Sequence, residues 1–165
     1  MKISFELNGQ PASLEIEPRE TLAEVLRARC RLTGVKLSCE AQVCGSCTVL
    51  VDGFPVSACT YLAYEVRDKR VTTIEGLADA AGHLHPLQQA FLDNFAFQCG
   101  FCTPGMILAA KSLLDQNPRA SDDEIIAYMS GNLCRCTGYL GILKAIRQAS
   151  AELQGRAKEK QAKRE

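Results

Sequence analysis

The stretch SCEAQVCGSCTVLVDG (residues 38–53) decides how the first half of the chain must fold. It contains Cys39, Cys44 and Cys47, and Cys59 follows after eleven more residues. The order Cys-x4-Cys-x2-Cys…Cys is typical of a plant-type 2Fe–2S cluster, which needs several thiolates from one loop. Residues 41–51 carry no charged side chain, which suits a cluster stabilised by backbone amide dipoles. A structural zinc site, the alternative, usually combines two short Cys-x-x-Cys pairs and fits the four-residue gap poorly.

Short strands are expected on both sides of this loop. Residues 2–7 and 12–17 alternate apolar and polar side chains around Asn8-Gly9, which predicts a β-hairpin. Residues 48–51 and 54–58 flank Asp52-Gly53 and predict a second pair. Weaker strand patterns cover 64–66 and 71–74. Thr21 and Glu24 form a capping-box pattern before a helix with one apolar face, made of Leu22, Val25, Leu26 and Cys30.

The pattern changes at residues 76–86, which are rich in Gly and Ala and are interpreted as a linker. Everything after the linker is predicted to be helical. The first helix should bury Leu87, Ala90, Phe91 and Phe95. Thr103-Pro104 is expected to be the N-cap and first residue of the second helix, which stops at Asn117-Pro118.

Two more helices complete the second half. Ser121 and Glu124 form another capping box, and Gly131 suits the end of that helix. The last helix places five apolar residues broadly on one side: Tyr139, Ile142, Leu143, Ile146 and Leu153. Residues 156–165 hold five basic and two acidic side chains and no apolar pattern, so a disordered tail is expected there.

A second set of cysteines lies in the helical half. Cys99-x2-Cys102 is followed, after 31 residues, by Cys134-x-Cys136. Both pairs precede predicted helices, whose N-termini favour anionic thiolates. The two helices between the pairs can bring their ends together. This spacing alone fits a four-cysteine zinc site as well as an iron–sulfur cluster, and the plant-type set nearby favours a second cluster.

The remaining candidate ligands are interpreted as structural. Cys30 lies on an apolar helix face and is expected to be a small buried side chain. His83 and His85 could bind metal but are expected in a solvated linker, because neither cysteine set lacks a ligand.

Composition excludes several classes of protein. The 165 residues carry 19 basic and 19 acidic side chains, so nucleic-acid binding is not expected. No 18-residue apolar run predicts membrane insertion, and no signal-peptide pattern is visible at the start. Nine cysteines without an export signal indicate metal ligands in a reducing, cytoplasmic setting.

Together, SCEAQVCGSCTVLVDG, QCGFCTPGMI (98–107) and GNLCRCTGY (131–139) resemble the small iron–sulfur subunit of the xanthine oxidase family of molybdenum hydroxylases. The resemblance covers about residues 2–153. It implies an α+β chain with a ferredoxin-like β-grasp domain at 1–76 and a four-helix-bundle 2Fe–2S domain at 77–155. Cys39, Cys44, Cys47 and Cys59 would hold one 2Fe–2S cluster, and Cys99, Cys102, Cys134 and Cys136 the other.

The resemblance also implies partners and a function. A large subunit with a molybdenum-pterin cofactor is expected, usually with a medium FAD subunit, in a dimer of heterotrimers. This chain would relay electrons from molybdenum to FAD or an external acceptor, with Gln98 and Cys136 beside the pterin. The alternatives are a free-standing ferredoxin or redox sensor, and a structural zinc adaptor.

One departure from the family pattern lies in the first loop. Ser38 and Gln42 stand where the family usually has glycine. Gln has no easy access to a positive φ, so the backbone at Gln42 is expected to differ.

Overall fold

The N-terminal half is built on a mixed five-stranded sheet with the strand order β2-β1-β5-β3-β4. In this computed structural model the backbone is described for residues 1–162 and the side chains for residues 1–156. β1 runs antiparallel to β2 and parallel to β5, whereas β3 is antiparallel to both β4 and β5. The strands are β1 (Lys2–Leu7), β2 (Gln10–Glu15), β3 (Thr48–Val51), β4 (Phe54–Ser57) and β5 (Arg70–Thr72).

Both predicted hairpins are confirmed. Asn8 and Gly9 have φ values of 51° and 78°, and Asp52 and Gly53 have 51° and 86°. Two consecutive positive φ angles are the geometry that matches a two-residue turn to the twist of its strands. The turn residues therefore set the register of each pair, and in the second hairpin they place β3 directly after the cysteine loop.

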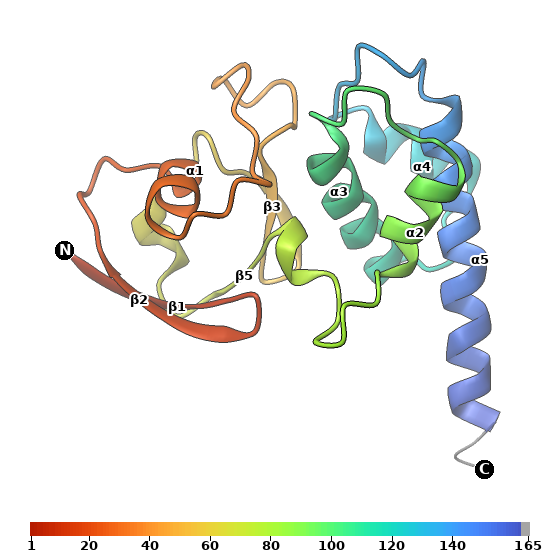
Figure 1. The fold of residues 1–165 in the computed structure, drawn as a ribbon, viewed down its shortest axis with the longest axis horizontal. Coiled ribbons are helices and arrows are strands. Elements are labelled where there is room, and N and C mark those ends of the chain that lie inside the picture. Colours follow the sequence, from red (N-terminus) through yellow and green to blue (C-terminus); the bar gives the residue numbers. More distant parts are fainter. Residues whose placement is uncertain (163–165) are drawn as a thin grey trace.

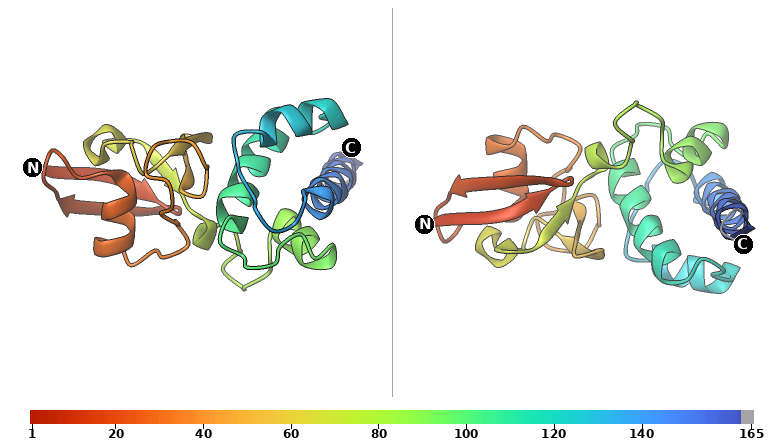
Figure 2. Two further views of the ribbon diagram at one scale, coloured as in Figure 1. Left: turned by 90° about the horizontal axis from the view of Figure 1, so that it is seen from above. Right: turned by 90° about the horizontal axis from the view of Figure 1, so that it is seen from below.

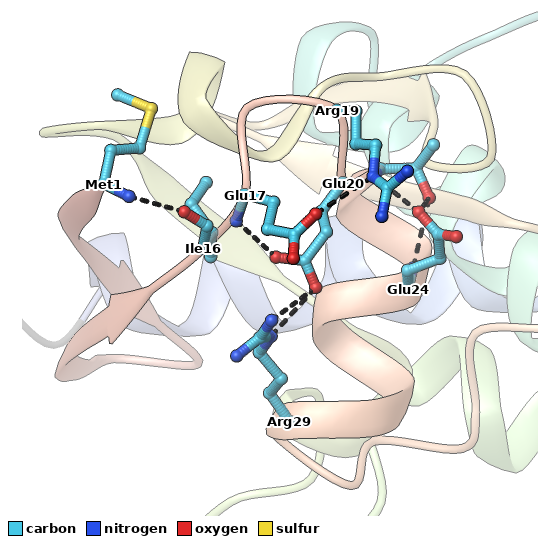
Figure 3. Close-up of polar contacts among 8 residues, drawn as sticks. Met1, Ile16, Glu17, Arg19, Glu20, Glu24 and Arg29 are labelled. Atoms are coloured by element: carbon cyan, nitrogen blue, oxygen red, sulfur yellow. Dashed lines mark hydrogen bonds and ion pairs between the residues drawn. The ribbon is translucent and has the colours of Figure 1, made fainter.

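A short helix packs across this sheet (Figure 1). It begins as α1 (Leu22–Glu24) with the predicted capping box between Thr21 and Glu24, and it continues as a π-helical turn, Val25–Arg29. Figure 3 shows the carboxylate of Glu20 accepting two hydrogen bonds from Arg29 across this turn. Cys30 follows the turn. Its side chain is only partly buried, whereas the sequence predicted a buried side chain.

Two strand predictions in this half need correction. Residues Ala63–Val66 form a 3-10 helix, because the chain needs a tight turn after Cys59 to return to β5. Val71 and Thr72 do enter the sheet, but the strand ends there and Ile74–Gly76 form another 3-10 turn.

The C-terminal half is a four-helix bundle beside the sheet (Figure 2). Its helices are α2 (Pro86–Asp93), α3 (Thr103–Gln116), α4 (Asp122–Met129) and α5 (Leu140–Ala162). The predicted capping box of Ser121 and Glu124 is confirmed. The buried core draws on all four helices, with Phe91, Met106, Ile125 and Ile146 among its largest members.

Three details of the bundle differ from expectation. Phe95 lies beyond the end of α2 and is 84 % exposed, so it is not part of the predicted apolar face. α3 begins one residue early, with Cys102 as the N-cap and Thr103 already helical. α5 continues to Ala162, so the expected tail is helical over most of its length, and residues 163–165 lie outside the described residues.

The two halves meet where α3 packs against β3 (Figure 1). The buried hydroxyl of Ser112, on α3, donates to the carbonyl of Gly53 in the β3–β4 turn. The residues of the first apolar core lie between Ile3 and Val71, and those of the second lie between Leu87 and Ala149. The exact domain boundary, between residues 76 and 77, stays a prediction. Within residues 1–162, no helix combines the length and the apolar character needed to cross a membrane.

Candidate metal centres

The first cysteine set occupies the loop before β3 and the end of β4. The side chains of Cys39 and Cys44 are neighbours that influence each other's ionisation, and the same holds for Cys47 and Cys59. Cys39 is exposed and Cys44 partly buried, whereas Cys47 and Cys59 are buried against the sheet. The four sulfurs therefore form an outer pair and an inner pair.

Backbone amides of the loop point at the outer pair. The N–H groups of Ala41 and Cys44 approach the Cys39 sulfur at 3.5 and 3.4 Å. These N–H groups, with that of Val43, lower the pKa of the Cys39 thiol to about 6. Burial instead raises the pKa of the Cys47 thiol to about 11. A metal that binds all four sulfurs must therefore displace the proton of the Cys47 thiol.

The conformation of Gln42 differs from the expectation made from its side chain. Its φ is 59°, so the backbone is left-handed as a glycine there would allow. The Gln42 amide oxygen accepts a hydrogen bond from the Thr60 hydroxyl, next to Cys59. This bond offsets part of the strain, because left-handed backbone costs a non-glycine residue about 1–2 kcal/mol.

The second cysteine set lies between the helix ends of the bundle. The sulfurs of Cys99 and Cys136 are 3.6 Å apart and exposed, and Cys102 and Cys134 form an inner pair. Only Cys102 adjoins a helix start, at the N-cap of α3, because Thr137, Gly138 and Tyr139 separate Cys136 from α5. Burial, with the neighbouring Cys134 side chain, raises the pKa of the Cys102 thiol to about 12.

Two hydroxyl groups whose role the sequence did not indicate, on Thr137 and Tyr139, hold this second loop together with the predicted Gln98. The Thr137 hydroxyl donates to the Cys134 sulfur at 3.2 Å. Burial opposes ionisation of Cys134, but this bond and nearby backbone N–H groups outweigh it and lower the pKa of the thiol. The Tyr139 hydroxyl accepts from the Cys134 N–H and donates to the Asn132 carbonyl. The Gln98 amide donates to the Cys136 carbonyl, which places Gln98 beside the exposed pair.

The distance between two sulfurs of the second set fits a shared metal ion. Two thiolates on one tetrahedral metal ion, each about 2.3 Å from it, lie about 3.8 Å apart. The 3.6 Å between Cys99 and Cys136 is close to that value. Among the described residues, no three His, Cys, Asp or Glu side chains converge to hold a metal ion. Sulfurs that meet in twos match a 2Fe–2S core, in which each iron takes two thiolates.

The two cysteine loops touch each other directly. The Leu133 N–H donates to the Cys44 carbonyl over 2.9 Å, so the residue before Cys134 is bonded to a cysteine of the first set. The Asn132 side chain reaches the neighbouring carbonyl of Gly45. Sequence reasoning missed both contacts, because they join residues almost 90 positions apart.

Fold and site together define an iron–sulfur protein with one 2Fe–2S domain in each half. Family models agree, since residues 5–78 match the 2Fe-2S iron-sulfur cluster binding domain and residues 73–147 match the 2Fe-2S binding domain.

Three relatives place the chain more narrowly. It is 49 % identical to the nicotinate dehydrogenase small FeS subunit of Eubacterium barkeri, over 89 % of this chain and 93 % of the relative. It is 45 % identical to the nicotine 6-hydroxylase small subunit of Paenarthrobacter nicotinovorans, over 93 % of this chain and 92 % of the relative. The crystal structure of quinoline 2-oxidoreductase from Pseudomonas putida 86 matches with a TM-score of 0.90 and 48 % identity, covering 94 % of this chain and 96 % of that one.

The chain therefore belongs to the small iron–sulfur subunits of the xanthine oxidase family of molybdenum hydroxylases. Such a chain is the electron-transfer subunit of an oxidoreductase complex and works with larger partner subunits. Two 2Fe–2S clusters supply the one-electron chemistry, and the protein positions them.

Proposed function

We propose that Cys39, Cys44, Cys47 and Cys59 hold one 2Fe–2S cluster and that Cys99, Cys102, Cys134 and Cys136 hold the other. The assignment rests on the 3.6 Å between the Cys99 and Cys136 sulfurs and on the side-chain interactions within the other three pairs, which are Cys39 with Cys44, Cys47 with Cys59, and Cys102 with Cys134. In each cluster one iron takes the outer, more exposed pair and the other iron takes the inner pair. Cys30 takes no part, since it packs against the sheet core.

Within this assignment, the chain's own groups keep the added electron stable. Reduction makes each cluster more negative, so N–H and O–H donors aimed at the sulfurs stabilise the reduced form. The Ala41 and Cys44 N–H groups do this in the first loop, and the Thr137 hydroxyl does it in the second. The buried pair of Cys47 and Cys59 keeps water away from half of the first cluster, and the partly buried pair of Cys102 and Cys134 shields the second less completely.

The exposed pair of the second set is where electrons enter. Cys99 and Cys136 are exposed, and Gln98 is held beside them by its bond to the Cys136 carbonyl. A molybdenum-pterin cofactor in a large subunit would lie against Gln98 and Cys136 and deliver electrons there. Cys39, Cys44, Cys47 and Cys59 would hold the first cluster, through which electrons would reach FAD in a medium subunit or an external acceptor.

Exposed apolar side chains of the helical half support docking of a large subunit on this face. Phe95 is 84 % exposed and Leu140, at the start of α5, is 80 % exposed. The Phe95 backbone abuts Gly141, so the two side chains come from adjoining segments. Phe101 and Leu133, close in sequence to cysteines of the second set, are also exposed. Apolar side chains that adjoin at a surface, unlike single exposed ones, mark an interaction site. We further propose a cytoplasmic dimer of heterotrimers.

Metal analysis and spectroscopy of the purified complex test the assignment. Iron should amount to four atoms per chain, and reduction should give two distinguishable paramagnetic signals. Cys59→Ser should remove the first signal alone, and Cys102→Ser the second alone. Cys30→Ser is the matched control and should keep all four irons. Zinc in place of iron, or loss of iron in the Cys30 variant, would contradict the assignment.

The order of electron flow has its own test. In Cys47→Ser, substrate should still reduce molybdenum and the second cluster, but FAD should stay oxidised on the timescale of turnover. Rapid-mixing absorption spectroscopy can follow each centre separately. Normal reduction of FAD in this variant would mean that the first cluster does not lie between molybdenum and FAD.

A further inference from the structure

We propose that Asn132, which belongs to the cysteine motif of the helical half, is a positioning residue for the first cluster. The inference rests on the proposed assignment of the cysteines. It states that one side chain near the second cluster tunes the properties of the other cluster by orienting the Gly45–Ser46 peptide.

The contacts of Asn132 fix the direction of its amide group. Its Nδ2 atom donates to the Gly45 carbonyl at 2.9 Å and to the Thr48 hydroxyl at 3.3 Å. That hydroxyl itself donates to the Gly45 carbonyl at 2.7 Å. The carbonyl can only accept, so the NH2 group of Asn132 must face it. Asn132 and Thr48 are each 6 % exposed, so this network is largely buried.

The neighbours of Gly45 leave no space for a side chain at this position. Gly45 has a φ of 69°, and a Cβ atom there would lie 2.6 Å from both Nδ2 of Asn132 and the Gly131 carbonyl. The Gly45 carbonyl is therefore held between Asn132 on one side and the start of β3 on the other. A residue 87 positions away thus determines how the peptide after Gly45 is oriented.

The orientation matters because the peptide carries a donor on its other side. In a trans peptide the C=O of Gly45 and the N–H of Ser46 point in opposite directions. With the C=O turned to Asn132, the N–H of Ser46 is turned away from it, within the segment that joins Cys44 to Cys47. Ser46 is buried, and among the hydrogen bonds of the described residues none has its N–H as the donor. A buried N–H without a protein acceptor is available to a cluster sulfur.

Two variants loosen this peptide by different routes. Asn132→Ala removes the amide donor, and Thr48→Val removes the hydroxyl while keeping the shape of the side chain. Thr137→Val is the matched control, because it removes a hydroxyl donor from Cys134 in the second set. The measurement is a redox titration of the reduced complex, followed through the two separate paramagnetic signals.

Asn132→Ala should lower the midpoint potential of the first cluster by an amount that changes its one-electron equilibrium about tenfold, which is about 59 mV. The second cluster should keep its potential, although Asn132 lies two residues from Cys134. Thr48→Val should give a smaller shift of the same sign and guards against a folding defect in the Asn132 variant. Thr137→Val should show the reverse, a lower potential for the second cluster only.

Three results would overturn the inference. They are unchanged first-cluster potentials in both variants, equal shifts of both clusters, or a shift confined to the second cluster. Loss of the first signal in Asn132→Ala, with two irons and the second signal retained, would support it. The proposed function fails separately, because wild-type protein without two iron–sulfur signals would already contradict it before any variant is made.

Discussion

Gly105, in the first turn of α3, faces the carbonyl oxygen of Gly45 so closely that no side chain fits between them. This contact joins the start of α3, the second helix of the bundle, to the cysteine loop of the other half. A Cβ atom at position 105 would have to displace backbone, which yields less easily than the end of a flexible side chain. The closeness of the two halves thus depends on the absence of a side chain at Gly105.

Gly105→Ala is therefore expected to destabilise the protein, although alanine favours helices. Overpacking of this kind costs about 1–3 kcal/mol. Gly155→Ala is the matched control, since Gly155 lies in α5 with open space around it. That change should stabilise the helix by about 0.5–1 kcal/mol. Chemical denaturation of both variants measures the difference, and equal effects would contradict the packing argument.

The left-handed backbone at Gln42 predicts that two substitutions change the free energy of unfolding by different amounts. Gln42→Ala keeps the strain and loses the bond from Thr60, so the free energy of unfolding should fall by about 1 kcal/mol. Gln42→Gly loses the same bond but relieves strain worth about 1–2 kcal/mol. It should therefore be at least as stable as Gln42→Ala. Urea unfolding compares them, and a less stable glycine variant would show that the strain is unimportant.

His85 makes the start of α2 sensitive to acid. Its Nδ1 atom accepts from the Leu87 N–H, which only an unprotonated Nδ1 can do. Burial, with the charge of Lys111, lowers the pKa of His85 below 6.5. Between the lowered pKa and 6.5 the folded state binds fewer protons than the unfolded state, so this contribution to stability is present above 6.5 and is lost as pH falls.

Thermal unfolding between pH 8 and pH 5 tests this sign. His85→Asn keeps a side-chain oxygen for the cap and should lose less stability on acidification than the wild type. His85→Ala removes the cap and should be less stable at every pH, by roughly 0.5–2 kcal/mol. Parallel pH curves for wild type and His85→Asn would rule out His85 as the cause.

Phe95 combines a φ of 47° with high exposure, a costly arrangement for a residue that serves only its own chain. Phe95→Gly should leave the stability of the isolated chain unchanged or raised, because it relieves the strain. It should weaken association with the large subunit, since the apolar ring is lost. Phe54→Gly, which removes an exposed ring from β4, controls for lost surface. Pull-down or titration calorimetry with the large subunit measures both, and unchanged binding of Phe95→Gly would exclude this docking contact.

Local rules explain what the sequence predicted well. Asn8-Gly9 and the two capping boxes depend on residues within four positions of each other, and all formed as expected. The cysteine spacings indicated two clusters for the same reason, because each short motif brings its own thiolates together. The two helices predicted between the halves of the second set already indicated that Cys99 and Cys102 meet Cys134 and Cys136, and the plant-type set nearby favoured a cluster over zinc.

Other features depend on contacts that no local pattern encodes. Phe95 continues the apolar spacing of α2, but the helix ends at Asp93 and the side chain turns outward. Ala63–Val66 carries too short a pattern to distinguish a strand from a 3-10 turn. The bond from Asn132 to Gly45 joins two motifs that look independent in the sequence. Each of these follows from how the halves pack, which depends on the whole chain.

The hydrogen bond between Leu133 and Cys44 also limits how the two halves can be exchanged between related proteins. A chimera could take its sheet half from one related protein and its helical half from another. Its two cysteine loops would then come from different proteins and need not fit each other. Such an exchange should work only where both parents share the same geometry at Gly45, Gly105 and Asn132. The two motifs are therefore expected to evolve, and to be transplanted, as a single unit.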